Sequence, residues 1–507
     1  MQDRYVRFAG RLVVLGFGAI GQGVLPLLVR HIDIHPEDII VVTADEQGGA
    51  EAHALGVGHQ VTPLTRENYR VLLDPLVRAG DFVLNIAVGV SSVAMISYCQ
   101  EKGALYLDIG IEHWQGGYTD AMNSLSARSN YCLREEALAL RHARGPTAVL
   151  THGANPGWVS HLVKQALLDI ARDCGLSAQP GDRAAWARLA RDLGVKVIQI
   201  SERDWQVAQP RRQPGEFLNT WSVDGLINES LQPAEVGGGS HEKQLPSDGC
   251  RHGYGGEAAI YLASPGALTK VRTWTPLAGP LHGLLMTHGE SISIADYLSV
   301  GQGQRAEYRP TVYYAYHPCD DTLGSLHELA GREFSGQQVG RVVRDEIVAG
   351  VDELGVLLMG HPRGAYWLGS RLSTEQARRL APYNSATTLQ VCAGVLAGVV
   401  WAIKNPTRGV VEPEELPFEQ LIALCQPYLG ELVGVYSDWT PLDKRHCLFP
   451  DQVDAADPWQ FANFRVTGPV ATAPDTVQTD RHQFAGAALG HAQRELKVPA
   501  RQNKELA

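Results

Sequence analysis

The chain has 507 residues, of which 44% are hydrophobic, and it carries a formal net charge of −11. This length is too great for one hydrophobic core, so we expect two or three domains. The acidic balance disfavours nucleic acid and anionic membranes as partners and suits a cationic small molecule, although ordinary cytosolic enzymes are often mildly acidic as well. We therefore expect neither nucleic acid nor a membrane as a partner.

The eight cysteines are scattered and form no Cys-x-x-Cys pair. Such a distribution is typical of reduced thiols rather than of a disulfide framework. The polar N-terminus lacks the apolar stretch of a signal peptide, and the longest apolar run, at residues 391–403, is short for a membrane span. These features predict a cytoplasmic protein.

The N-terminal part of the chain alternates between β-branched runs and stretches with helical spacing. Strands are expected at residues 11–15, 39–43, 81–87 and 104–109, and helices at residues 20–30, 66–78 and 92–102. This alternation predicts an α/β fold with a doubly wound parallel sheet and right-handed crossovers. We place this N-terminal Rossmann domain at residues 1–150.

From about Thr151 the pattern becomes mixed. We expect helices at residues 161–173 and 386–404 and strands at residues 196–201, 271–275 and 291–294. The predicted organisation is an α+β catalytic and dimerisation domain at 151–375, then a helical C-terminal segment at 376–467 that packs back on the Rossmann domain. A weak helical stretch near residues 482–496 lies in a predicted flexible tail at 468–507.

The segment Gly16-Phe17-Gly18-Ala19-Ile20-Gly21 has Gly-x-Gly-x-x-Gly spacing and lies between the first predicted strand and the first predicted helix. Gly16 permits a tight turn, Gly18 lets the backbone approach a pyrophosphate at the helix N-terminus, and Gly21 lets helix and strand pack closely. The pattern alone is weak evidence for a dinucleotide site, but its position between a predicted strand and a predicted helix makes the evidence strong. We expect all six residues to contact a dinucleotide.

An acidic residue at the end of the second strand selects NAD by binding the adenosine ribose. Asp45 occupies this position, with Glu46 in reserve, and no arginine follows closely to neutralise a 2′-phosphate. NAD is therefore favoured over NADP. The alternative interpretation is that Asp45 only caps the next turn. We also assign Ala87 and the pair Asn155-Pro156 to the cofactor site.

Polar clusters in the rest of the chain suggest a catalytic site. Glu112 follows the fourth strand, at the sheet edge where α/β folds bind ligands, although it could be a surface acid. The Asn155-Pro156 pair could equally be a helix cap and hinge. The spacings His288-x-Glu290 and His317-x-x-Asp320 do not match a metal site, so we expect no metal. There is no Gly-x-Ser-x-Gly nucleophile elbow either.

Long runs of sequence identify a family. They lie at residues 16–23 (GFGAIGQG), 128–135 (RSNYCLRE), 153–167 (GANPGWVSHLVKQAL), 202–204 (ERD), 219–225 (NTWSVDG), 287–298 (THGESISIADYL), 309–318 (RPTVYYAYHP), 352–361 (DELGVLLMGH) and 433–442 (VGVYSDWTPL). On these runs the chain resembles the bacterial homospermidine synthases, which are NAD-dependent relatives of the saccharopine dehydrogenases. The resemblance extends from Gly10 to about Phe464.

The resemblance implies an aminoalkyl transfer without net redox change. NAD oxidises a primary amine carbon of putrescine, a second putrescine attacks as ammonia leaves, and the same NADH reduces the resulting Schiff base to sym-homospermidine. The resemblance also implies a homodimer.

The resemblance further assigns an amine site, formed by Glu112, Asn155, Glu202, Trp221, Glu229, His288 and Glu290. Of these we expect Glu112, Trp221, Glu229 and His288 to be catalytic, and Asn155, Glu202 and Glu290, together with His113, to bind substrate. Carboxylates suit the two ammonium ends of a diamine, and an indole face stabilises transient cations. A buried carboxylate, Glu112 or Glu229, can accept the amine proton before hydride transfer.

Three positions depart from the family pattern. Gly89 stands where an aspartate is usual, His113 where a proline is usual, and Ala44 where a relative can carry the ribose-binding acid. The lost acid removes a ligand for an ammonium group. A protonated His113 beside Glu112 would further weaken the binding of that ammonium end. We therefore expect an altered amine preference or reduced activity.

Two other interpretations remain open at this point. One is a different NAD(P)H-dependent reductive coupler that joins an aldehyde to an amine or an amino acid. Its carboxylate substrate would require a matching arginine in the second domain. The other is a non-catalytic NAD-binding homologue that arose through the loss of the acid at Gly89.

Overall fold

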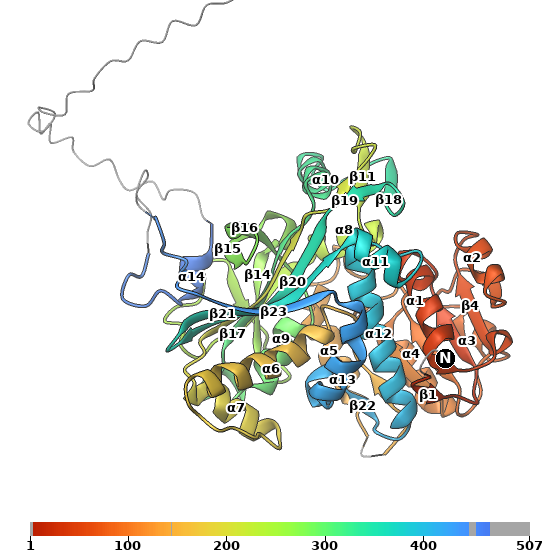
Figure 1. Ribbon diagram of the computed structural model, residues 1–507, viewed down its shortest axis with the longest axis horizontal. Coiled ribbons are helices and arrows are strands. Elements are labelled where there is room, and N and C mark those ends of the chain that lie inside the picture. The colour runs from red at the N-terminus through yellow and green to blue at the C-terminus, as the bar shows by residue number, and fades with distance from the viewer. Residues whose placement is uncertain (1–3, 143, 446–452, 467–507) are drawn as a thin grey trace, which may run out of the picture. The chain divides into compact units, whose positions relative to one another are not determined.

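The computed structural model describes residues 4–142, 144–445 and 453–466. Two large sheets organise these residues, and Figure 1 labels some of the strands of each. The predicted tail at 468–507, with its weak helical stretch, lies outside the described residues.

The first sheet has seven parallel strands in the order β22-β8-β7-β6-β2-β4-β5. The strands are β2 (Leu12–Leu15), β4 (Ile39–Thr43), β5 (Gly58–Val61), β6 (Phe82–Asn85), β7 (Leu105–Asp108), β8 (Ala148–Val149) and β22 (Val410–Val411). The central strands β2, β6 and β7 are buried along their whole length, as expected for a parallel sheet with helices on both faces. The predicted doubly wound α/β domain is confirmed.

The helices of this domain are α1 (Ala19–His31), α2 (Gly49–Ala54), α3 (Tyr69–Leu73), α4 (Ser92–Lys102) and α5 (Asn130–Ala139). Helix α3 is much shorter than the helix predicted at residues 66–78. It ends at Leu73, and the helical hydrogen-bond pattern is interrupted after the N–H of Asp74, because Pro75 has no N–H to donate. Two-residue strands β1 (Val6–Arg7) and β3 (Ile32–Asp33) form a separate parallel pair.

The second sheet is mixed, and its ten described strands confirm the predicted α+β domain. The strands are β9 (Val197–Asp204), β12 (Pro233–Gly237), β13 (Gly249–Arg251), β14 (Ala259–Pro265), β15 (Lys270–Thr275), β16 (Gly279–Met286), β17 (Thr311–His317), β20 (Val351–His361), β21 (Gly364–Ser373) and β23 (Glu431–Ser437). At its centre, β9 pairs in parallel with β17 and antiparallel with β20. Four short strands form two further pairs, β10 (Val207–Ala208) with β19 (Ile347–Ala349) and β11 (Glu216–Asn219) with β18 (Val339–Val342).

The helices of the second domain are α6 (Trp158–Asp173), α7 (Arg183–Asp192), α8 (Val223–Leu231), α9 (Glu290–Tyr297), α10 (Asp320–Gly331), α11 (Thr374–Leu380), α13 (Phe418–Cys425) and α14 (Phe461–Phe464). The strand predicted at residues 291–294 was wrong, because these residues lie in α9. The alternation of serine and isoleucine there suggested a period of two. All four residues are buried, however, so the alternation does not separate an inner face from an outer one.

Helix α12 (Ala386–Lys404) packs against α1, and Figure 1 shows the two helices side by side. Helix α12 also lies against the loop before α6. A Cβ at Gly394 would lie 1.9 Å from the carbonyl oxygen of Gly153 in that loop, so this second contact requires glycine. Among the described helices, α12 alone is long and apolar enough to cross a membrane, and 89% of its apolar window is buried in the protein. The strands β22 and β23 that follow α12 join different sheets, so the segment 376–467 connects both domains.

Candidate active site

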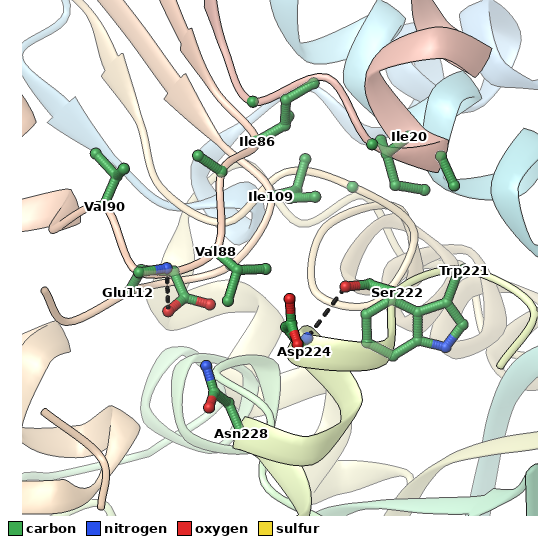
Figure 2. A pocket seen from close by; sticks show the side chains of 18 of the residues that line it. Ile20, Ile86, Val88, Val90, Ile109, Glu112, Trp221, Ser222, Asp224 and Asn228 are labelled. Atoms are coloured by element: carbon green, nitrogen blue, oxygen red, sulfur yellow. Dashed lines mark hydrogen bonds between the residues drawn. The ribbon is translucent and has the colours of Figure 1, made fainter. Parts of the chain in front are cut away.

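A cavity of about 550 Å³ lies between the two domains, at the carboxyl ends of the Rossmann strands. Loops that follow β2, β4, β6 and β7 line one side, and residues from α8, β17 and the turn before α9 line the other. Figure 2 shows Val88 and Glu112 on the Rossmann side, facing Asp224 and Asn228 of α8. We call this space the site cavity.

One end of the site cavity is formed by residues predicted to bind a dinucleotide. These are Gly16, Gly18, Ala19, Ile20, Gly21, Asp45, Ala87, Asn155 and Pro156. Phe17 does not belong to the lining, which differs from our expectation. Its side chain is 2% exposed and packs in the hydrophobic core, because it turns inward between two loop residues that face the cavity.

The glycine loop has the shape that a pyrophosphate requires. Gly16 has φ = +89°, and a Cβ there would lie 2.7 Å from the Cα of Ala87. A Cβ at Gly18 would meet no atom within 4 Å, so its backbone faces open space. No side chain caps the start of α1, and its first turn contains no acidic residue. The first N–H groups of α1 are therefore available to an anion, and the residues fit a dinucleotide.

Asp45 lines the site cavity, whereas its reserve Glu46 is not among the lining residues. The Oδ1 atom of Asp45 accepts a hydrogen bond of 2.9 Å from the backbone N–H of Gln47. The side chain thus caps the turn, as the alternative interpretation expected. Because this bond uses one carboxylate oxygen, it is compatible with a second role at the ribose.

In the other half of the site cavity, Glu202 lies at the end of β9 and is 2% exposed. Its Oε2 accepts hydrogen bonds from the hydroxyl of Tyr314 at 2.6 Å and from the side-chain amide of Asn155 at 3.1 Å. Burial raises the pKa of Glu202 to about 8, against the opposing effect of the bond from Tyr314. Glu202 can therefore gain or lose a proton near neutral pH.

His288 lies between two carboxylates. Its Nδ1 is 3.2 Å from Oε1 of Glu290, and its Nε2 is 3.2 Å from Oε2 of Glu229, in an alignment too poor for a hydrogen bond. Burial by itself would lower the pKa of His288, but Glu290 and Glu229 outweigh it and raise this pKa to about 10. The ring also lies 4.3 Å from the ring of Tyr314. His288 is therefore an imidazolium at neutral pH.

Glu112 follows β7 and faces α8 across the site cavity (Figure 2). The backbone N–H of Gly89 donates a hydrogen bond of 3.4 Å to its Oε2. Burial raises the pKa of Glu112 to about 8, and the carboxylates of Glu229 and Asp108 contribute in the same direction. A cation placed between Glu112 and Glu229 would reduce the repulsion between the two carboxylates and would favour the ionised form of Glu112.

Trp221 precedes α8, and its indole lies over Gly225 in the first turn of that helix. A Cβ at Gly225 would lie 2.9 Å from the ring atom Cζ3 of Trp221, so glycine makes this position of the indole possible. Trp221 lines the site cavity on the side that carries Asp224 (Figure 2). It offers an aromatic surface to a cation bound there.

Two residues predicted to bind substrate are not among the lining residues of the site cavity. Glu290 stands behind His288 and is 1% exposed. His113 packs its ring against Tyr118 at 4.9 Å, and burial lowers the pKa of His113. Its charge beside Glu112 was expected from adjacency in sequence, but Glu112 lines the site cavity and His113 does not. His113 is therefore uncharged at neutral pH.

The sequence interpretation missed several lining residues, among them Tyr314, Asp224, Asn228, Arg344 and Thr387. Tyr314 reaches Glu202 because β17 pairs with β9, and the two residues are 112 positions apart in the chain. No local signal predicts such a contact. Asp224 and Asn228 were detectable in principle. They are four residues apart, which places them on one face of α8, and they lie in the same stretch as Trp221 and Glu229, which were predicted.

Comparison with known protein families matches both domains. Residues 12–149 match the saccharopine dehydrogenase NADP binding domain, and residues 153–437 match the saccharopine dehydrogenase C-terminal domain.

The chain is similar to curated proteins over nearly its whole length. A homospermidine synthase from Blastochloris viridis is 49% identical over 91% of this chain and 98% of that protein. A homospermidine synthase from Mesorhizobium japonicum is 46% identical over 91% of this chain and 97% of that protein.

Two solved structures are also similar. The crystal structure of a homospermidine synthase from Legionella pneumophila in complex with NAD covers 92% of this chain and 99% of that chain, with 46% identity and a TM-score of 0.86. The saccharopine dehydrogenase (L-Glu forming) of Saccharomyces cerevisiae covers 85% of this chain and 100% of its own, with a TM-score of 0.50 at 12% identity, which shows a shared fold only.

Proposed function

This chain belongs to the homospermidine synthase family, and from that premise we propose that it joins two putrescine molecules into sym-homospermidine, releases ammonia, and uses a bound NAD that is restored in each cycle. The family inferred from the sequence runs is thereby confirmed. The observation that carries the proposal is a single cavity that contains both the glycine loop and the carboxylates Glu112, Glu202 and Glu229. A diammonium substrate needs such a set of acids next to a nicotinamide.

NAD supplies reversible hydride acceptance at the amine carbon, and it returns the same hydride to the Schiff base between the two substrate molecules. We propose NAD rather than NADP because Asp45 lies at the end of β4, where it would repel a 2′-phosphate. The NAD complex of the Legionella relative supports this choice.

The chain's own residues bind the amines and move their protons. Glu202, held by Tyr314 and Asn155, binds one ammonium end. Glu229 accepts a proton from the reacting amine. The carbon can lose a hydride only when its nitrogen is an uncharged amine with a free lone pair. The second putrescine likewise attacks the imine only through an uncharged amine. Trp221 stabilises the iminium cation through its indole face.

The imidazolium of His288 lies between Glu229 and Glu290, 3.2 Å from each, and helps to fix their positions. Since Glu229 and His288 are 3.2 Å apart, a proton accepted by Glu229 weakens their ion pair, which drives the proton back to the departing ammonia. Ammonia leaves as the second amine displaces it, so no water enters the product.

We further propose that the enzyme is a homodimer in the cytoplasm. The support for the dimer is family membership. The support for the compartment is that all seven described cysteines are unpaired.

Mass spectrometry of the products tests the function directly. Incubation with putrescine and a catalytic amount of NAD is expected to form one homospermidine and one ammonia for every two putrescines consumed, over many turnovers per NAD. NADH that accumulates in proportion to putrescine consumed contradicts the recycling mechanism. NAD binding without turnover across a panel of diamines would instead indicate a non-catalytic homologue, which is the expected consequence if Gly89 removes an essential ammonium ligand.

An amino acid as the second substrate is not favoured by the lining of the site cavity. A carboxylate substrate needs a cationic partner in the amine half. The imidazolium of His288 is already matched by Glu229 and Glu290, each 3.2 Å away. Among the described lining residues the only arginine is Arg344, and its guanidinium bonds to Gln22 of α1 at the cofactor end.

The activity should depend on pH through Glu112 and Glu202. Burial raises the pKa of each to about 8, so both ionise as the pH rises through 8. A group with this pKa is about one-tenth ionised at pH 7, so we expect kcat/KM for putrescine to rise roughly tenfold or more from pH 7 to pH 9. Initial rates across this range check the prediction. The Glu112→Gln variant should show a shallower rise, and a flat wild-type profile would contradict the assignment.

A further inference from the structure

Arg344 reaches the site cavity from the second domain. It lies between β18 and β19, and it lines the cavity together with Gly340 and Val342. Strand β18 pairs with β11, and β19 pairs with β10. The arginine is thus presented by paired strands rather than by an isolated loop.

The guanidinium of Arg344 is directed toward the glycine loop. Its Nη1 donates a hydrogen bond to Oε1 of Gln22. The Gln22 amide is itself oriented by a bond of 2.8 Å from its Nε2 to the carbonyl of Phe17, and its side chain is buried. The backbone N–H of Gln22 bonds to the carbonyl of Gly18, so Gln22 lies one turn from the start of α1. The guanidinium is therefore held close to the place where a pyrophosphate binds.

The backbone of Arg344 is also fixed. Its N–H donates a hydrogen bond of 3.0 Å to the carboxylate of Glu346, and its carbonyl accepts one of 2.6 Å from the guanidinium of Arg378 in α11. A side chain that starts from a fixed backbone loses less entropy when it binds a ligand.

The charges of the site cavity give this arginine a specific task. Among the described lining residues it is the only arginine and no lysine is present, and the imidazolium of His288 is already paired with Glu229 and Glu290. Five lining residues have side-chain carboxyl groups: Asp45, Glu112, Glu202, Asp224 and Glu229. A pyrophosphate carries two negative charges, and a helix N-terminus offers the equivalent of only about half a positive charge. A guanidinium matches two phosphate oxygens with paired hydrogen bonds and supplies a full charge.

We propose that Arg344 binds the pyrophosphate of the dinucleotide from the second domain and thereby retains the cofactor between the two hydride transfers. This inference rests on the proposed function, because a reaction without net redox change requires NADH to stay bound until the Schiff base is formed. Gln22 lies one turn from the start of α1, and a Cβ at Gly48, in the loop that carries Asp45, would lie 2.7 Å from its Nε2. The comparison of NADH with NADPH therefore distinguishes the pyrophosphate from the ribose 2′-position. The contact also links the two domains across the cofactor.

The test compares NADH binding by the wild type and by Arg344→Met, using the fluorescence of NADH in the full-length enzyme. Loss of a charge-assisted contact is expected to raise the Kd for NADH about tenfold and to raise its dissociation rate by a similar factor. The salt dependence of the Kd should become weaker. The KM for putrescine at saturating NAD should not change. Arg344→Lys keeps the charge without the paired donors and should lie in between.

Arg305→Met is the matched control, because Arg305 is an exposed arginine that does not line the site cavity. An unchanged Kd for NADH in folded Arg344→Met overturns the proposal. A loss of affinity confined to NADPH also overturns it, since it assigns Arg344 to a 2′-phosphate. If the wild type binds NADH but forms no homospermidine, the proposed function fails, and the Kd values still decide the role of Arg344.

Discussion

Replacement of Glu229 by Gln is expected to lower kcat for homospermidine formation by roughly 100-fold or more, because general acid–base catalysis contributes on this scale. The amide retains the size of the side chain but cannot accept the amine proton. It also removes one of the two carboxylates that raise the pKa of His288, which lies 3.2 Å away. The affinity for NAD should stay within about twofold, because the expected loss is in proton transfer rather than in cofactor binding. Steady-state rates and NADH fluorescence titration measure the two quantities separately.

The matched control for this change is Glu307→Gln, which alters a surface carboxylate that pairs with Arg191 and is 65% exposed. It should leave both quantities unchanged. Equal losses of turnover and of NAD affinity in Glu229→Gln would contradict a role in proton transfer and would indicate a distorted cavity instead.

Replacement of Trp221 by Ala is expected to lower kcat about 30- to 100-fold, because a desolvated cation–π contact contributes about 2 kcal/mol or more and because the indole also excludes water. The iminium intermediate carries the charge that the indole stabilises, so the loss should appear in kcat more than in the KM for putrescine. Rate measurements over a range of putrescine concentrations distinguish the two effects. Some loss of stability will accompany the change, since Trp221 also packs against the hydrophobic core.

Trp221→Phe separates the aromatic role from simple packing. Phenylalanine retains an aromatic face, so this variant should keep a larger share of the activity than Trp221→Ala does. Thermal melting shows whether both variants are folded at the assay temperature. Unchanged kinetics in Trp221→Ala would leave Trp221 with a packing role only.

The departures at Gly89 and His113 have different consequences in the folded protein. His113 is neutral and packs against Tyr118, so it adds no charge to the amine site. Gly89 lines the site cavity with φ = +75°, and its N–H bonds to Glu112. We therefore expect Gly89, rather than His113, to be the departure that bears on amine preference.

The cofactor end of the cavity was predictable from consecutive residues. A strand, a tight turn and a helix follow one another within the first 31 positions. The glycines of this loop affect only nearby backbone; Gly16, for example, adopts the positive φ that the turn requires. Asp45 follows the next strand in the same repeating unit. Local backbone geometry and hydrophobic periodicity are sufficient for such a loop.

The amine end was not accessible in this way. Apart from Glu112, which its position at the sheet edge indicated, its residues were assigned only by resemblance. Glu202, Glu229 and His288 come from a strand, a helix and a turn that meet through the pairing of distant strands. Tyr314, the partner of Glu202, is contributed by a strand 112 residues further along. Long-range pairing of this kind leaves no periodic trace in either segment.

The amino-acid sequence was thus sufficient to predict a Rossmann domain, its cofactor loop and the family. Folding was needed to place Glu112 in the cavity and its neighbour His113 outside it, and to bring Arg344 to the glycine loop. It was also needed to set the charges of His288 and Glu202, because a pKa depends on burial and on carboxylates from other elements. The physical reason is that backbone turns are local properties of the chain, whereas side-chain direction, desolvation and charge pairing arise only when distant segments pack together.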